Sequence, residues 1–211
     1  MNRVSRIFGE TSWRPTFYLC TSTNVQFENW RADILEGQKL GVPFFMWDQL
    51  SADLPPTENS ILLNCVDGEL TYSNVTDQTW SDSPEVSVSK FGSSMFVAFQ
   101  LASYMSYSEV VILGADLGYR ETLGQKLAAR FGLMGLVHFL DKNHFGRGYG
   151  TPGAPPNVLN LNMLEAHRIA REKMSSQGIS VFNASRETKN LSIWENVPLA
   201  QILRESRSFE K

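Results

Sequence analysis

The segment from Asp141 to Gly153 gathers chemically active side chains on a glycine-rich stretch that cannot form a regular helix or strand. His144 titrates near neutral pH and suits the role of a general acid or base. Arg147 can bind a phosphate or carboxylate through its fork of donors, and Tyr149 adds a hydroxyl to the same stretch. The segment predicts a ligand-binding or catalytic loop, and the alternative is a surface loop with an incidental histidine.

A second group of polar residues surrounds an apolar pattern with helical spacing. Lys90, Ser93 and Ser94 precede that pattern, and Asp116 and Tyr119 follow the next strand-like run. Free backbone amides and the helix dipole make a helix start a natural phosphate site, and ligands of parallel sheets bind beyond the carboxyl ends of the strands. The group therefore predicts a phosphate site, and the alternative is a simple serine cap followed by a strand-end turn.

Other candidate sites are weaker. Asp141 with His144 could hold a divalent metal, but two ligands are an incomplete set, so we expect no metal site. His167 falls on the apolar stripe of its helix, which favours a hydrogen-bonded core histidine over a ligand. Cys20 and Cys65 lie in apolar runs without metal-binding spacing and are expected to be buried free thiols. The common dinucleotide, P-loop and hydrolase motifs are missing from the sequence.

These residues must be positioned by short apolar runs that alternate with helical patterns. The continuous apolarity of the runs predicts strands covered on both faces, and the alternation predicts one α/β domain over residues 1–211, with an open, mostly parallel sheet and helices on both faces. Long loops are expected at 67–89 and 141–157. Strands are expected at 16–21, 42–47, 61–66, 109–114 and 179–182, and helices at 24–35, 93–105, 121–140, 160–177 and 198–206.

Composition restricts the class of protein. The chain has 211 residues, 19 Lys plus Arg against 22 Asp plus Glu, and a net charge of −3. This balance argues against nucleic acid as the partner. The sequence shows neither an apolar run of membrane-spanning length nor a signal-peptide pattern at Met1. We therefore expect a cytoplasmic protein.

Five stretches together resemble a known bacterial family. At Phe91–Tyr119 the sequence places Gly-Ser-Ser, a helical pattern and the run Val-Val-Ile-Leu-Gly-Ala-Asp-Leu-Gly-Tyr in the family's order. This resembles the domain shared by proteins similar to hydroxymethylpterin diphosphokinases and motility accessory factors, and more distantly the bacterial lipooligosaccharide sialyltransferases. The other matching stretches are Asn2-Arg3, Thr11–Tyr18, Asp141–Phe145, and Asn183–Ser185 with Leu191 and Trp194–Val197.

The resemblance implies a Rossmann-like fold that binds a nucleotide or another phosphorylated donor. In the sialyltransferase branch, an asparagine in the position of Asn2 contacts the donor nucleotide. The Ser93–Ser94 helix start and the turn with Asp116 and Tyr119 would face the same cleft, with the tyrosine assisting the leaving phosphate. A histidine in the later loop, here His144, would serve as base for the acceptor hydroxyl.

One departure from the family concerns the N-terminus. The family opens with a strand and a Gly-Asn-Gly-Pro-Ser-Leu turn that binds phosphate, and this sequence lacks that turn. The resemblance thus implies a domain shortened at its N-terminus by one βα unit of roughly 30 residues. Because a missing strand would leave a sheet edge open, we expect the chain to form a homo-oligomer or to rearrange its N-terminus.

The sequence is compatible with three functions. The first is a nucleotide-sugar-dependent glycosyltransferase of surface glycan assembly, with a CMP-activated acidic sugar as donor and a glycan as acceptor, which could also associate peripherally with a membrane. The second is a pterin diphosphokinase-like enzyme, which would need Mg²⁺ for transfer from ATP. The third is a non-catalytic nucleotide- or carbohydrate-binding module, which would keep its function after His144→Ala.

Overall fold

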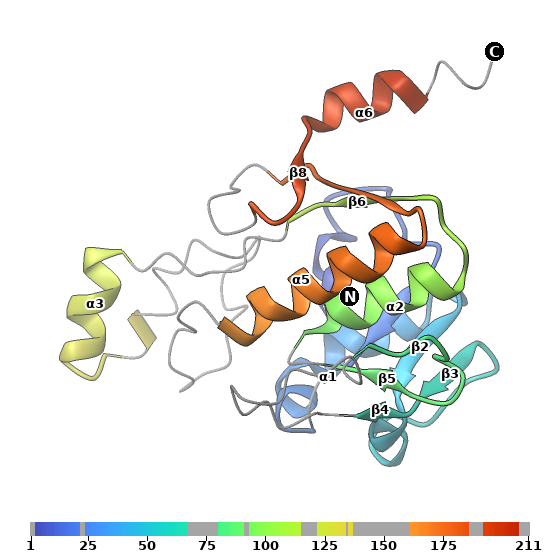
Figure 1. The fold of residues 1–211 in the computed structure, drawn as a ribbon. Coiled ribbons are helices and arrows are strands. Elements are labelled where there is room, and N and C mark those ends of the chain that lie inside the picture. The colour runs from blue at the N-terminus through green and yellow to red at the C-terminus, as the bar shows by residue number, and fades with distance from the viewer. Residues whose placement is uncertain are drawn as a thin grey trace. The chain divides into compact units, whose positions relative to one another are not determined.

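The computed structural model describes residues 3–21, 24–66, 80–90, 93–114, 122–133, 135–136, 161–185 and 192–206 (Figure 1). The described part combines helices with short parallel strands, so the protein is of the α/β type. The chain divides into two compact units. Unit 1 comprises Met1–Leu62 and Gly118–Leu159, and unit 2 comprises Leu63–Leu117 and Asn160–Lys211.

Unit 1 contains a sheet in which the strands lie in the order β1, β2, β3. The bounds are Tyr18–Cys20 for β1, Phe44–Trp47 for β2 and Ser60–Leu63 for β3, with helix α1 at Asn24–Gln38 between β1 and β2. Strands β1 and β2 are parallel, and every residue in them is buried. The prediction that both faces of the strand are buried is therefore confirmed for β2. It is wrong for β3, where Ile61 and Leu62 are 42% and 48% exposed.

A close contact fixes α1 against this sheet. Tyr18 is fully buried, and its ring stacks on Phe44 with the centroids 5.1 Å apart. Gly37 lies in the last turn of α1 directly beside the Tyr18 ring, where a Cβ atom would come closer to the ring carbons than real Cβ atoms do. A glycine is therefore required at position 37 by the approach of the ring.

Gly37→Ala is expected to lower the free energy of unfolding by about 2 kcal/mol. The added Cβ overpacks the contact with the Tyr18 ring, and this destabilisation exceeds the stabilisation from the higher helix propensity of alanine. Gly9→Ala is the matched control, because a Cβ atom there meets no described atom within 4 Å. Equilibrium unfolding in urea measures both variants. Equal stability of the two would show that the Tyr18 ring moves aside freely.

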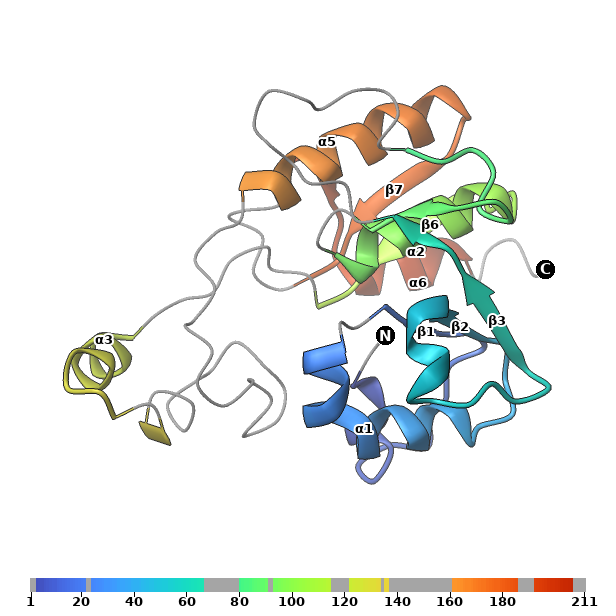
Figure 2. The same cartoon turned by 90° about the horizontal axis from the view of Figure 1, so that it is seen from below.

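Unit 2 contains two parallel sheets and three described helices. Strands β4 (Cys65–Val66) and β5 (Val88–Ser89) form one pair, and β6 (Glu109–Ile112), β7 (Ser180–Asn183) and β8 (Glu195–Asn196) form the other sheet in that order. The helices are α2 (Ser94–Tyr104), α5 (Leu161–Ser176) and α6 (Leu199–Ser206). Figure 2 shows β6 and β7 side by side.

The core of unit 2 lies where α2 and α5 pack together over β6 and β7 (Figure 1). The apolar stripe predicted for the helix at 160–177 is buried: His167, Ala170 and Met174 are each 0% exposed. The buried core residues are Trp80, Phe96, Phe99, Ile112, Ala166, Ala170, Met174, Ile179 and Trp194.

The structure differs from the predicted elements at several places, which include two unpredicted 3-10 helices, Val4–Ile7 and Asp48–Ala52. The run at 61–66 is interrupted at Asn64 and contributes to both β3 and β4. The two residues of β5 fall inside the segment expected to be the loop at 67–89, and β8 was not predicted. The helix expected at 121–140 is represented by α3 (Leu123–Arg130), which ends before Gly132 because that glycine takes a φ of +69°.

Candidate functional site

The candidate site lies at the start of α2, just beyond the carboxyl end of β5. In the parallel pair, Cys65 lies opposite Val88 and Val66 opposite Ser89. The next residue, Lys90, extends the ladder by donating its backbone N–H to Val66 O over 3.2 Å. Lys90 is only 6% exposed. A cationic residue is therefore held in a buried position at the sheet edge where parallel sheets bind ligands.

Ser93 caps α2. Its backbone is extended, with φ −144° and ψ 124°, and its Oγ accepts a hydrogen bond from Met95 N at 3.2 Å. The serine N–H donates to Lys90 O at 2.8 Å, and its carbonyl accepts from Phe96 N at 3.1 Å. The alternative of a serine helix cap is thus confirmed for Ser93. Its Oγ–H remains chemically able to donate to an anion at the helix start.

Gln100, a residue of α2, connects this helix to β5 through hydrogen bonds of its side chain. Its side chain is fully buried, and its Oε1 accepts from Ser89 N at 3.0 Å and from Ser81 N at 3.1 Å. Its Nε2 donates to Ser89 O at 2.7 Å and to Phe96 O at 3.0 Å. Val88 N and Lys90 N both face β4, so Ser89 presents its peptide groups to the other side. The carboxamide therefore pairs with Ser89 as a neighbouring strand would.

His167 is a buried core histidine, as its position on the apolar stripe predicted. Its Nδ1 accepts a hydrogen bond from Trp194 Nε1 at 2.8 Å, and its ring lies edge-on to Phe99 with the centroids 5.4 Å apart. Burial lowers the pKa of His167 to about 4. Its Nε2 is buried and makes no hydrogen bond within the part of the chain that the structure describes. The ring is therefore neutral near pH 7 and packs against Phe99 and Trp194 in the core.

An open cavity of about 380 Å³ lies beside the end of α5 and the first half of β7. Its wall contains Arg171 from α5, Trp194 and Glu195 at β8, and residues 178–182. Hydrogen bonds pair Phe182 and Asn183 with β8, so the cavity runs beside the part of β7 that β8 does not reach. The sequence did not predict this cavity, because its lining is brought together only when α5, β7 and β8 pack.

The structure describes two of the site residues predicted from the sequence, Ser93 and Ser94, and places them together with Lys90 at the start of α2. Asn2, Asp116, Tyr119, His144, Arg147 and Tyr149 lie outside the described residues. Gln100 was missed. The signal that could have found it is its spacing, because it follows Phe96 by four residues and so lies on the apolar face of the helix.

Metal binding and membrane spanning can be judged for the described residues. Among them, no three His, Cys, Asp or Glu side chains lie close enough together to hold a metal ion. In the same part of the chain, none of the helices has the length and apolarity needed to cross a bilayer. The two cysteines, Cys20 and Cys65, are buried thiols that form no disulfide bond, as predicted.

Comparisons were made with models of protein families, with curated proteins and with solved structures. None of the three finds a match to this chain.

Proposed function

We propose that the protein is a nucleotide-sugar-dependent glycosyltransferase, with a Rossmann-like fold and a CMP-activated acidic sugar as donor. The observation that carries the proposal is the start of α2, where buried Lys90 and the capping residue Ser93 follow a parallel strand. A lysine and a helix N-terminus both favour an anion, and a donor phosphate has the matching charge. The motif order from Phe91 to Tyr119 supports the same family of transferases.

The proposed reaction transfers the sugar from the donor phosphate to an acceptor hydroxyl. His144 takes the proton of the acceptor hydroxyl as its oxygen bonds to the anomeric carbon. The bond from that carbon to the phosphate oxygen breaks, and Tyr119 donates a proton to the departing nucleotide phosphate. Asn2, Asp116 and Tyr149 contact the donor. Arg147 binds an anionic group of the donor.

Lys90→Met tests the proposal, because methionine keeps the apolar stem and removes the ammonium. Isothermal titration of the full chain with CMP is expected to show binding that weakens about tenfold or more in this variant, since a charge-assisted hydrogen bond is worth roughly 1.5–3 kcal/mol. Lys39→Met is the matched control, because Lys39 is an exposed lysine at the end of α1. Its CMP affinity is expected to equal that of the parent chain.

Two outcomes would reject the proposal. If no cytidine nucleotide binds the parent chain, the donor is wrong. If Lys90→Met binds CMP as tightly as Lys39→Met, the start of α2 is not the phosphate site. Titration with ATP and Mg²⁺ distinguishes the diphosphokinase alternative, which predicts binding and turnover of ATP only with the metal.

A further inference from the structure

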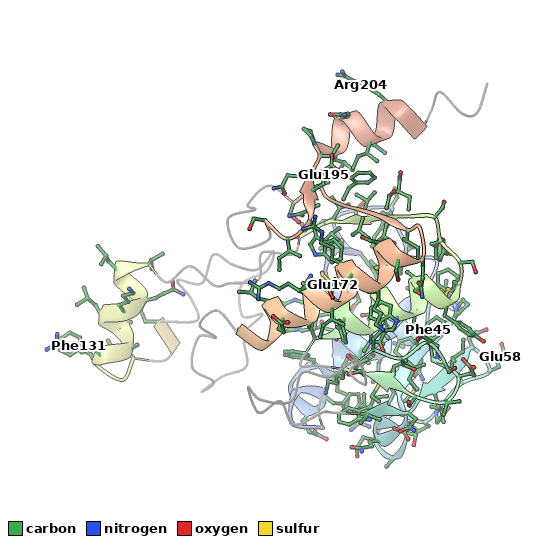
Figure 3. The ribbon with its side chains drawn as sticks, in the orientation of Figure 1. Phe45, Glu58, Phe131, Glu172, Glu195 and Arg204 are labelled. Carbon is green, nitrogen blue, oxygen red and sulfur yellow. The ribbon has the colours of Figure 1, made fainter. Side chains whose placement is uncertain are left out.

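Helix α3, in unit 1, exposes its apolar side chains. Leu123 is 80% exposed, Leu127 is 56% exposed, and Phe131, which follows the last turn, is 71% exposed. Figure 3 labels Phe131 beside α3. These residues are spaced by four positions and therefore lie along one side of the helix. Two residues away from this side, Gln125 and Ala128, are buried at 3% exposure each, whereas Ala129 is exposed. The helix thus buries an amide and exposes leucines, the reverse of an ordinary surface helix.

The helix start explains how a buried amide is tolerated here. Thr122 Oγ1 accepts from Gln125 N at 3.2 Å, and Gln125 Oε1 accepts from Thr122 N at 2.8 Å. The pair forms a capping box, so the buried Gln125 side chain has a hydrogen-bond partner within its own helix. Leu133 and Leu136, which follow the helix in the chain, are also exposed, at 53% and 44%.

The charged residues of the described segment 122–133 are both positive. Lys126 and Arg130 are exposed, and each follows a leucine of the apolar side by three residues, so the two cations line one edge of it. Residues 122–136 contain no Asp or Glu, although the whole chain has a net charge of −3. The exposed side of α3 therefore combines an apolar stripe with a cationic border.

We infer that α3 docks on the surface of a lipid bilayer that contains anionic headgroups. A short helix with a leucine and phenylalanine face and a basic border lies in the plane of such an interface, with the acyl boundary covering the apolar side chains. Long cationic side chains at the border reach the headgroups while their stems stay apolar. With eight residues, α3 is roughly 12 Å long and would lie along the bilayer rather than cross it.

The charges favour a bilayer over a second copy of the chain. Two copies packed through this face would bring the Lys126 and Arg130 side chains of both into one interface, where like charges repel. An anionic bilayer neutralises the same side chains. This inference is independent of the proposed transferase, because it uses none of the residues at the start of α2.

Co-sedimentation of the full chain with vesicles tests the inference. Binding is expected with vesicles of phosphatidylcholine and phosphatidylglycerol, and much less with phosphatidylcholine alone. The double variant L127Q/F131Q removes apolar area without changing charge and is expected to bind roughly tenfold more weakly. K126Q/R130Q is expected to lose roughly tenfold on the anionic vesicles only.

Val86→Gln is the matched control, because Val86 is 68% exposed in unit 2 and far from α3 in sequence. Its vesicle binding is expected to equal that of the parent chain, and circular dichroism verifies that every variant is folded. Equal sedimentation of the parent chain and L127Q/F131Q would overturn the inference. So would light scattering that shows a dimeric parent chain and a monomeric L127Q/F131Q variant, because a second copy would then cover the face.

Discussion

Gln100→Met is expected to lower the free energy of unfolding by about 3 kcal/mol or more. Methionine matches glutamine in length but offers Ser81 N–H and the peptide groups of Ser89 no partner. Each buried polar group that loses its hydrogen bond costs roughly 1–3 kcal/mol. Three such groups are left, and Ser89 is only 9% exposed, so water cannot easily replace the amide.

The position of Gln100 gives this variant a second, local effect. Ser89 directly precedes Lys90, so loosening β5 also loosens the start of α2. Amide hydrogen exchange is expected to show faster exchange at Ser81 and Ser89, and CMP affinity is expected to fall with it. Urea unfolding gives the global loss. Gln49→Met, at an exposed glutamine, is the control for removing an amide at the surface.

Two results would contradict the expected role of Gln100. A loss below about 1 kcal/mol in Gln100→Met would mean that its amide contributes no more than an average hydrogen bond. Unchanged exchange at Ser89 would mean that β5 does not depend on it.

Acidification from pH 7 to pH 5 is expected to cost about 2 kcal/mol of stability through His167 alone. Burial holds the pKa of His167 near 4 in the folded chain, whereas an unfolded histidine titrates near 6.5. Between these values the unfolded chain binds the extra proton, so stability falls as the pH falls. Above pH 6.5 both states are neutral, and the full stabilisation is present. The rings beside His167, those of Phe99 and Trp194, carry no charge that could stabilise an imidazolium.

His167→Asn isolates this contribution. Asparagine places an acceptor oxygen near the position of Nδ1, where it can still accept from Trp194 Nε1, and it does not titrate. The variant is expected to be less stable at pH 7, because it is smaller than histidine, but its stability should change less between pH 7 and pH 5. Urea midpoints at several pH values measure the slope. His144→Asn is the control and should keep the slope of the parent chain.

An unchanged slope in His167→Asn would assign the acid sensitivity to other groups. Loss of the slope in His144→Asn would assign it to the glycine-rich segment at 141–153. Nuclear magnetic resonance of the imidazole protons would then identify the histidine that titrates in the folded chain.

Most of the elements in the described residues could be predicted from local patterns. The all-apolar run of β2 and the stripe with Ala170 and Met174 on α5 follow periodicities that only burial explains. The helix start at Ser93 was predictable because a serine before an apolar helical pattern satisfies a free amide. These features depend on neighbours within a few positions in the chain.

The short strands could not be predicted in the same way. Strands β5 and β8 contain two residues each, too few to show a periodicity, and they exist because β4 and β7 present hydrogen-bonding groups to them. Which side of α3 faces solvent could not be predicted from the sequence either. Leucines at helical spacing predict a buried stripe, whereas the structure exposes them and buries Gln125 and Ala128.

The candidate site also has features that the sequence could predict and features that it could not. Local sequence patterns were enough to place Lys90, Ser93 and Ser94 before a helix and to identify the motifs on which the proposed transferase depends. The burial of Lys90, the pairing of Gln100 with Ser89 and the hydrogen bond from Trp194 to His167 are visible only in the folded chain. This difference comes from distance along the chain, because a cap is satisfied within three residues, whereas the partner of a buried polar group can lie anywhere in the sequence.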